Sequence, residues 1–249
     1  ADELFDQRII TAPTTEALYS YIQEGQERIA EHPQRLKEIT KEANREARRL
    51  WLDAQGMISA PTGPIDLLGI IKKLGFVQLD TIRVVARAHD HILWSRNQNY
   101  REPMLQKLFA KERQLFEHFT HDASLIPMVF YPWWERQFSR LGARVHKRLA
   151  GRKGGIEGLA LEELLARIDA EGPLSTHAFN TKIDGPREMW KRPPHKQGLD
   201  YLWYSGRLTT SHREGFTKFY DLTEKVIPDE IRMSQKPHEE QIDWLCDAA

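Results

Sequence analysis

Three consecutive residues, Gln78, Leu79 and Asp80, carry side chains that together could hydrolyse a bond at a sugar carbon. If the run FVQLD is extended, Gln78 and Asp80 point to one side and Leu79 to the other. A carboxylate can accept a proton from water or face a developing positive charge, and a carboxamide can hold that water in place. The alternative is structural, because Asp80 could instead cap a helix that begins near Thr81.

Histidine and aspartate gather at two further places in the sequence. These side chains can ligate a metal ion. Their spacing matches no closed zinc motif, however, and no cysteine is near them. We therefore expect core or surface histidines, with no metal and no cofactor. The two groups are His89, Asp90 and His91, and His118, His121 and Asp122, of which His121 and Asp122 are kept as second-tier site candidates.

Basic residues form two groups in which a DNA contact can be predicted. Residues 136–153 contain seven Lys or Arg and no acid, and a spacing of four places the first four arginines on one helical face. The second group leads into a predicted helix at the position of a recognition helix. Such charges would neutralise phosphates, whereas the alternative is a solvated face. The residues are Arg136, Arg140, Arg144 and Arg148, then Lys191, Arg192, His195 and Lys196.

The composition sets limits on the class of protein. The 249 residues include 36 Lys plus Arg and 36 Asp plus Glu, so a basic patch must be local. A single cysteine, Cys246, excludes an internal disulfide. The start ADELFDQRII has no apolar signal core, and no stretch approaches the ~20 apolar residues of a membrane helix. A cytoplasmic protein is expected. Phosphate-binding loops, dinucleotide fingerprints, nucleophile elbows and HExxH motifs are absent from the sequence.

The pattern before residue 155 predicts three parts. Residues 1–45 form a charged helical extension divided at Pro33. Residues 46–100 contain a helix from Glu46, a second from Pro64 to Gly75, a third over residues 81–88 and a strand at HILWS, which is the order of a winged helix. Residues 101–155 form a helical, basic connector with buried faces that include Leu115, Phe116 and Phe119.

A second winged-helix unit is predicted over residues 156–228. Leu161, Leu164, Leu165 and Ile168 have the spacing of an amphipathic helix. HKQGLDYLWYSG reads as a later helix, and RLTTS and FTKFYDL as two strands joined by HREG. Residues 229–249 are then a C-terminal remnant. The expected fold class is α+β, mainly helical, with tandem winged helices.

The motifs together resemble a known family. QLDTIRVVARAHDHILWSRNQNY, FEHFTHDASLIP, KRPPHKQGLDYLWYSGRL and KFYDLT look like the winged-helix DNA glycosylases of the YcaQ (AlkX) and AlkZ family, over residues 46–228. The family motif is Gln, an apolar residue, then Gln or Asp, which Gln78, Leu79 and Asp80 match in the Asp form. The resemblance implies tandem winged helices around a DNA cleft, and it implies that this chain is truncated before a further winged helix and a β-rich domain.

The resemblance also implies a function. Family members cleave the N-glycosidic bond of bulky N7-alkylated purines, including those in interstrand crosslinks, with water as the nucleophile. Asp80 would be base or charge stabiliser and Gln78 would orient water, while Arg83 and Arg87 would contact the DNA backbone together with the basic groups above. The expected partner is damaged double-stranded DNA, with association with the nucleoid during repair. A non-catalytic winged-helix regulator remains the alternative, since fold does not fix function.

Overall fold

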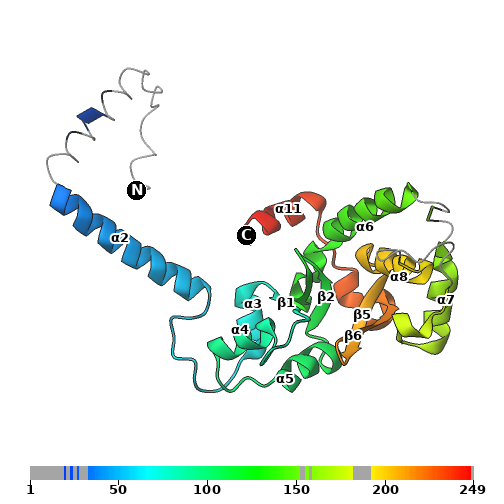
Figure 1. Cartoon of the computed structure of the whole chain (residues 1–249). Coiled ribbons are helices and arrows are strands. Elements are labelled where there is room, and N and C mark those ends of the chain that lie inside the picture. Colours follow the sequence, from blue (N-terminus) through cyan, green and yellow to red (C-terminus); the bar gives the residue numbers. More distant parts are fainter. Residues whose placement is uncertain are drawn as a thin grey trace. The chain divides into compact units, whose positions relative to one another are not determined.

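The computed structural model of the protein describes residues 20, 23–24, 27, 33–151, 155–156, 159–181 and 192–247 (Figure 1). The chain divides into two compact units, residues 1–53 and 54–249. Helix α2 (Pro33–Ala54) carries most of the described part of the first unit, and the predicted break at Pro33 borders residues outside the described part. The separate helix expected from Glu46 was wrong, because α2 continues without a break through this stretch, with Leu50 and Trp51 exposed.

The second unit begins with a small antiparallel sheet whose strand order is β1–β3–β2. Ile71, Leu93 and Phe109, which come from the helices around it, are almost inaccessible to solvent and form its core with Leu115 and Leu125. The elements are α3 (Leu67–Leu74), β1 (Val77–Gln78), α4 (Ala88–Arg96), α5 (Glu102–Gln106), the π-helical turn η2 (Lys107–Lys111), β2 (Leu115–Phe119), β3 (Ala123–Pro127) and the 3-10 helix η3 (Met128–Trp133).

Several elements predicted in this half were wrong. Residues 81–87 form no helix, and HILWS lies in helix α4 rather than in a strand. The buried residues His89, Asp90 and Leu93 have helical spacing. The short apolar run within HILWS was assigned to a strand because a run of this length fits either a strand or a helix. Residues 115–119 form strand β2 instead of a helix. The prediction failed because both faces of this strand are covered, so its sequence lacks the apolar–polar alternation of a half-buried strand. Helix α3 ends at Gly75 as expected but starts at Leu67, behind an Asp66 cap.

The remainder of the second unit follows its predicted pattern more closely. Helix α7 contains the predicted leucines, and α8 buries Leu199, Leu202 and Trp203. A second antiparallel sheet has the order β4–β6–β5. The class, α+β and mainly helical, is therefore confirmed. The elements are α6 (Glu135–Ala150), α7 (Leu161–Glu171), β4 (Leu174–Ser175), the 3-10 helix η5 (Thr176–Ala178), α8 (Pro194–Tyr204), β5 (Leu208–Glu214), β6 (Thr217–Leu222), α9 (Thr223–Val226), α10 (Asp229–Arg232) and α11 (His238–Asp247).

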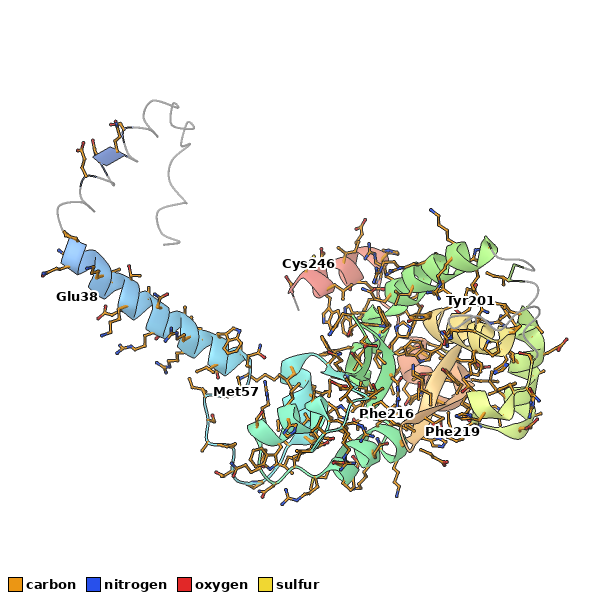
Figure 2. The ribbon with its side chains drawn as sticks, viewed as in Figure 1. Glu38, Met57, Tyr201, Phe216, Phe219 and Cys246 are labelled. Carbon is orange, nitrogen blue, oxygen red and sulfur yellow. The ribbon has the colours of Figure 1, made fainter. Side chains whose placement is uncertain are left out.

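The β5–β6 hairpin connects the two sheets. Strand β5 runs to Glu214, so the turn is only Gly215 and Phe216 rather than the predicted HREG. Both turn residues have positive φ, at 50° and 74°, as a two-residue hairpin turn of type I′ requires. Phe216 is labelled in Figure 2, at the hairpin end that faces α4 and α5. The hairpin is thus packed into the body of the unit and its tip is partly buried.

A buried group of charges fixes this packing. Glu117 of β2 is fully buried and accepts two hydrogen bonds from Arg213 of β5, at 2.7 and 2.8 Å. Lys218 of β6 lies 2.9 Å from the same carboxylate and 3.4 Å from the centre of the Trp203 ring. Burial alone would raise the pKa of Glu117, but Lys218 and Arg213 outweigh it and hold that pKa below its ordinary value. The carboxylate is therefore charged and fully paired.

Candidate active site

The Gln78–Leu79–Asp80 motif lies at the end of strand β1. Leu79 is buried, and its N–H donates to the Ala123 carbonyl of β3 at 2.8 Å. Gln78 pairs with Ser124 in the register of the sheet, and both Gln78 and Asp80 are partly exposed. A buried apolar residue between two accessible polar ones is the arrangement expected from an extended backbone. The anchored Leu79 thus presents a carboxamide and a carboxylate toward solvent.

The side chain of Gln78 is oriented by His121. Its Oε1 lies 2.7 Å from His121 Nε2, and because an amide oxygen can only accept, the imidazole donates. No described residue accepts a hydrogen bond from the Gln78 –NH₂ group, which can therefore donate to a substrate or to water. Phe76 packs its ring against His121 with the centroids 5.9 Å apart. The neighbouring Asp122 makes a local bond to the Ala123 N–H at 2.7 Å, which shapes the β2–β3 turn.

Asp80 is held by local bonds that leave part of its carboxylate available. Its Oδ1 accepts from the Ile82 N–H at 2.8 Å, and its own N–H donates to His89 Nδ1 at 3.1 Å. The structural alternative of a cap on a helix at Thr81 was wrong, since no helix begins there. Among the described residues, nothing forms a hydrogen bond with Oδ2 of Asp80. One oxygen therefore positions the loop while the other can face a substrate.

Behind Asp80, a buried chain of polar groups ends at Tyr100. His89 accepts at Nδ1, so its proton lies on Nε2, which is 3.8 Å from Asp90 Oδ2. The other Asp90 oxygen accepts from the Tyr100 hydroxyl at 2.7 Å. Burial lowers the pKa of His89 in spite of Asp90, and burial raises the pKa of Tyr100. A neutral His89 can thus serve as a fixed acceptor for the Asp80 backbone.

The hairpin tip supports the same segment from the other side. The Phe216 ring stacks on His89, with the centroids 6.2 Å apart. The guanidinium groups of Arg87 and Arg213 lie over the Phe216 ring at 4.5 and 4.7 Å. Sequence reasoning considered His89 only as a possible metal ligand or a core or surface histidine and gave no role to Phe216, since these contacts join residues distant along the chain. The one available signal was an aromatic residue beside the glycine of the predicted turn.

The predicted DNA contacts differ in how accessible they are. Helix α6 places Arg140, Arg144 and Arg148 on its exposed side, with Arg136 partly exposed at its start. Among the described residues, none of these four lies within ion-pair distance of a carboxylate. Arg140 donates instead to Gln137, and Arg136 to His238. Helix α6 therefore carries a row of arginines that, within the described part of the chain, form no ion pair.

The remaining basic candidates are more constrained. Arg83 pairs with Glu102 at 3.0 Å, and Arg192 pairs with Asp200. His195 is buried and lies beside Thr181 at 2.6 Å, so it is not among the residues that we retain for a DNA contact. Lys196 is partly exposed at the start of α8. Lys191 lies outside the described residues.

Two clefts lie near the motif. One, of about 490 Å³, is lined by Phe76 and Thr120 beside the Gln78–His121 pair and by Arg140 of helix α6. A second, of about 820 Å³, is lined by Arg87, His89 and Phe216. Both clefts thus include a residue close to the motif, Phe76 in the first and His89 in the second, and both carry basic side chains. A third cleft, of about 570 Å³, surrounds Arg207 and Glu224, and none of the three clefts has Gln78, Leu79 or Asp80 in its lining.

Two features bear on the class of protein. Across the part of the chain that the structure describes, no three His, Cys, Asp or Glu side chains converge as ligands of a metal ion. His118 in particular is a core residue that accepts from Trp134 at 2.8 Å. Within the same described residues, no helix combines the length and the apolar character needed to cross a membrane.

The chain can be compared with known families. No solved structure matches it. The model of the family described as "DNA glycosylase AlkZ-like" matches residues 71–249, which include the Gln78–Asp80 motif, His121 and helix α6. Because this match extends over more than half of the sequence, the chain belongs to the AlkZ-like DNA glycosylase family.

Proposed function

We propose that this protein is a monofunctional DNA glycosylase that releases bulky N7-alkylated purines, including purines tied into interstrand crosslinks. One observation carries the proposal: the family-matching motif presents Gln78 and Asp80 side by side at a strand end, with the amide oriented by His121. The amide –NH₂ and one carboxylate oxygen remain available for a substrate. A carboxamide beside a carboxylate suits an attack by water at C1′ of deoxyribose.

The chemistry needs no acid for the leaving group. An N7-alkylated purine already carries positive charge, so the electrons of the breaking C1′–N9 bond neutralise it as the base departs. Water forms the new bond to C1′ and loses its proton to Asp80. The same carboxylate stabilises the positive charge that develops on the sugar. Gln78 holds the water through a hydrogen bond. A water nucleophile leaves an abasic site and no covalent enzyme intermediate.

Helix α6 supplies the electrostatic part of DNA binding in this proposal. Arg140, Arg144 and Arg148 would neutralise phosphates, which gives an affinity that depends on salt and little on sequence. Support for a winged-helix assignment comes from the order α7–β4–η5–α8–β5–β6, with the sheet order β4–β6–β5. We propose a winged-helix unit over residues 156–228. The bounds 46–100 predicted for a first unit do not fit, because α2 crosses residue 46 and the other two strands of the β1 sheet lie at residues 115–127. The β5–β6 hairpin of residues 156–228 contacts the rest of the protein through Phe216, whose ring lies under the Arg87 guanidinium.

The experiment compares base release with binding. Wild type, Asp80→Asn and the control Asp243→Asn, whose side chain is exposed on α11, are incubated with a duplex that carries a nitrogen-mustard N7-guanine adduct or crosslink. Wild type and Asp243→Asn should release the adduct and leave alkali-labile sites. Asp80→Asn should bind equally but release little. Borohydride should trap no enzyme–DNA adduct.

The outcomes separate this proposal from the alternative of a non-catalytic DNA-binding protein. Equal binding by all three proteins without release of base by any would support the binding protein. Release that is unchanged in Asp80→Asn would remove Asp80 from the mechanism. Borohydride trapping of wild type would indicate a covalent amine mechanism and contradict the role of water.

A further inference from the structure

The loop that follows the motif is apolar and exposed. Ile82, Val84 and Val85, which we call the apolar loop, are 70%, 90% and 81% exposed. Residues 81–87, which include these side chains, form neither a helix nor a strand. Three neighbouring β-branched side chains expose apolar surface to water at a free-energy cost. Exposed apolar patches of this kind mark surfaces that contact a partner.

The apolar loop is supported at both ends. At its start, the Ile82 N–H is bound by Asp80, and Leu79 is anchored to β3. At its end, Arg87 stacks on Phe216. Between the apolar side chains, Arg83 is paired with Glu102. The apolar loop is therefore held at its two ends and by one ion pair to Glu102 of α5.

The apolar loop lies next to Asp80, and this position indicates which partner contacts it. Ile82 is two residues beyond Asp80, which places the two Cα atoms no more than ~7 Å apart, and its N–H is bonded to the Asp80 carboxylate itself. If Asp80 acts at a deoxyribose, as the proposed function requires, the flanking base pairs of that nucleotide are brought against the apolar loop. Apolar side chains that meet a duplex can enter between base pairs and partly unstack them.

We infer that Ile82, Val84 and Val85 form a wedge that opens the base stack of duplex DNA beside the damaged nucleotide. In a stacked duplex the flanking base pairs restrict access to C1′ of the damaged nucleotide, for a mono-adduct as for a crosslink, so we expect attack by water to be faster when the neighbouring step is open. The wedge supplies that opening from the segment that also carries Asp80. The Asp80 carboxylate is thereby kept next to the opened base step.

The test uses a duplex with one nitrogen-mustard N7-guanine adduct and 2-aminopurine as its neighbour, whose fluorescence rises on unstacking. Stacking is measured in the Asp80→Asn background, so that the DNA stays intact. The wedge variant is Ile82→Ser/Val84→Ser/Val85→Ser. The control is Met233→Ser, which removes a side chain that is 74% exposed next to α10. Thermal unfolding and sedimentation check fold and oligomeric state.

We expect the Met233→Ser protein to raise the fluorescence as the parent does. The wedge variant should give a rise at least about fivefold smaller at saturating protein. With Asp80 restored, the wedge variant should release the adduct about tenfold more slowly from a matched duplex. A mismatch opposite the adduct, which already weakens the stack, should recover most of that loss. These results together would support the wedge.

Three results would overturn the inference. The first is an undiminished fluorescence rise in the wedge variant. The second is a slow release of the adduct that the mismatch does not recover. The third is a change of oligomeric state in the wedge variant, which would show that a second copy covers the loop. Failure of wild type to release any adduct is read in a separate assay and would count against the proposed function instead.

Discussion

Asp80 and Glu117 are two carboxylates of the same small region, and their surroundings are opposite. Glu117 is fully buried and paired with both Arg213 and Lys218. Asp80 is partly exposed at the end of β1, with one oxygen on the Ile82 N–H and, among the described residues, no ion pair. Glu117 is held by the β5–β6 hairpin, whereas the bonds of Asp80 are to Ile82 and His89.

The difference separates charge that holds the fold from charge that is available for chemistry. Every oxygen of Glu117 already has a partner, so this side chain has no capacity to meet a substrate. The motif around Asp80 keeps unused hydrogen-bonding groups on both the carboxylate and the Gln78 amide. We therefore expect changes at Glu117 to act on stability, and changes at Asp80, Gln78 and His121 to act on the rate of base release.

The largest expected effect follows from removal of the Glu117 carboxylate. Glu117→Ala leaves Arg213 and Lys218 buried without a counter-charge, and we expect the free energy of unfolding to fall by about 3–5 kcal/mol. Glu162→Ala is the control, because that carboxylate pairs with Arg207 at an exposed site and should change stability little. Urea unfolding measures both. Equal stability of the two variants would contradict the distinction between the two kinds of charge.

Acid should destabilise the protein through His118. Burial lowers the pKa of His118 to about 3 from the ordinary 6.5. Between these two pH values the histidine is therefore protonated in the unfolded chain and neutral in the folded protein. The stabilisation is complete above pH 6.5 and is lost as the pH falls toward 3, by about 2–3 kcal/mol near pH 4.5. His118→Gln keeps an acceptor for Trp134 but cannot titrate. Its plot of unfolding free energy against pH should be flatter, and an unchanged slope would contradict the assignment.

His121 should affect catalysis without affecting the fold. His121→Ala removes the donor that orients Gln78, so we expect kcat for base release to fall about 10- to 100-fold with a small change in KM. His121→Gln can still donate and should recover part of the rate. His91→Ala, also at an exposed histidine, is the matched control. A defect that appears mainly in KM would indicate a DNA contact instead.

The smallest effects are expected on helix α6. Replacing Arg140, Arg144 or Arg148 singly by Gln should weaken DNA binding by severalfold and reduce the slope of log affinity against log salt by about 1 for each phosphate that is no longer neutralised. Arg207→Gln, at an ion-paired site, should leave that slope unchanged. Fluorescence anisotropy at several salt concentrations measures it. Slopes that do not respond to the α6 variants would place the DNA elsewhere.

The elements with one clear period could be predicted from the sequence. Helices α7 and α8 agree with their apolar spacing, and the β5–β6 hairpin was predicted as two strands, although its turn is Gly215–Phe216 and not HREG. Residues 81–87 and helix α4 were misassigned. The apolar residues of the 81–87 loop suggested the buried face of a helix, although in the structure they are exposed. Gln78 and Asp80 became candidates through their residue types and extended spacing, and the family motif then supported them. Their link to His89, and the support from Phe216, depend on packing between distant segments, which local pattern does not encode.

The most direct test is a single-turnover measurement of adduct release at saturating protein, with wild type, Asp80→Asn and Glu117→Gln compared at a temperature where all three are folded. We predict that the rate falls at least about 100-fold in Asp80→Asn, and that the rate of Glu117→Gln stays close to that of wild type despite its lower stability. Release that survives in Asp80→Asn but disappears in folded Glu117→Gln would contradict the catalytic role of Asp80 and the structural role of Glu117.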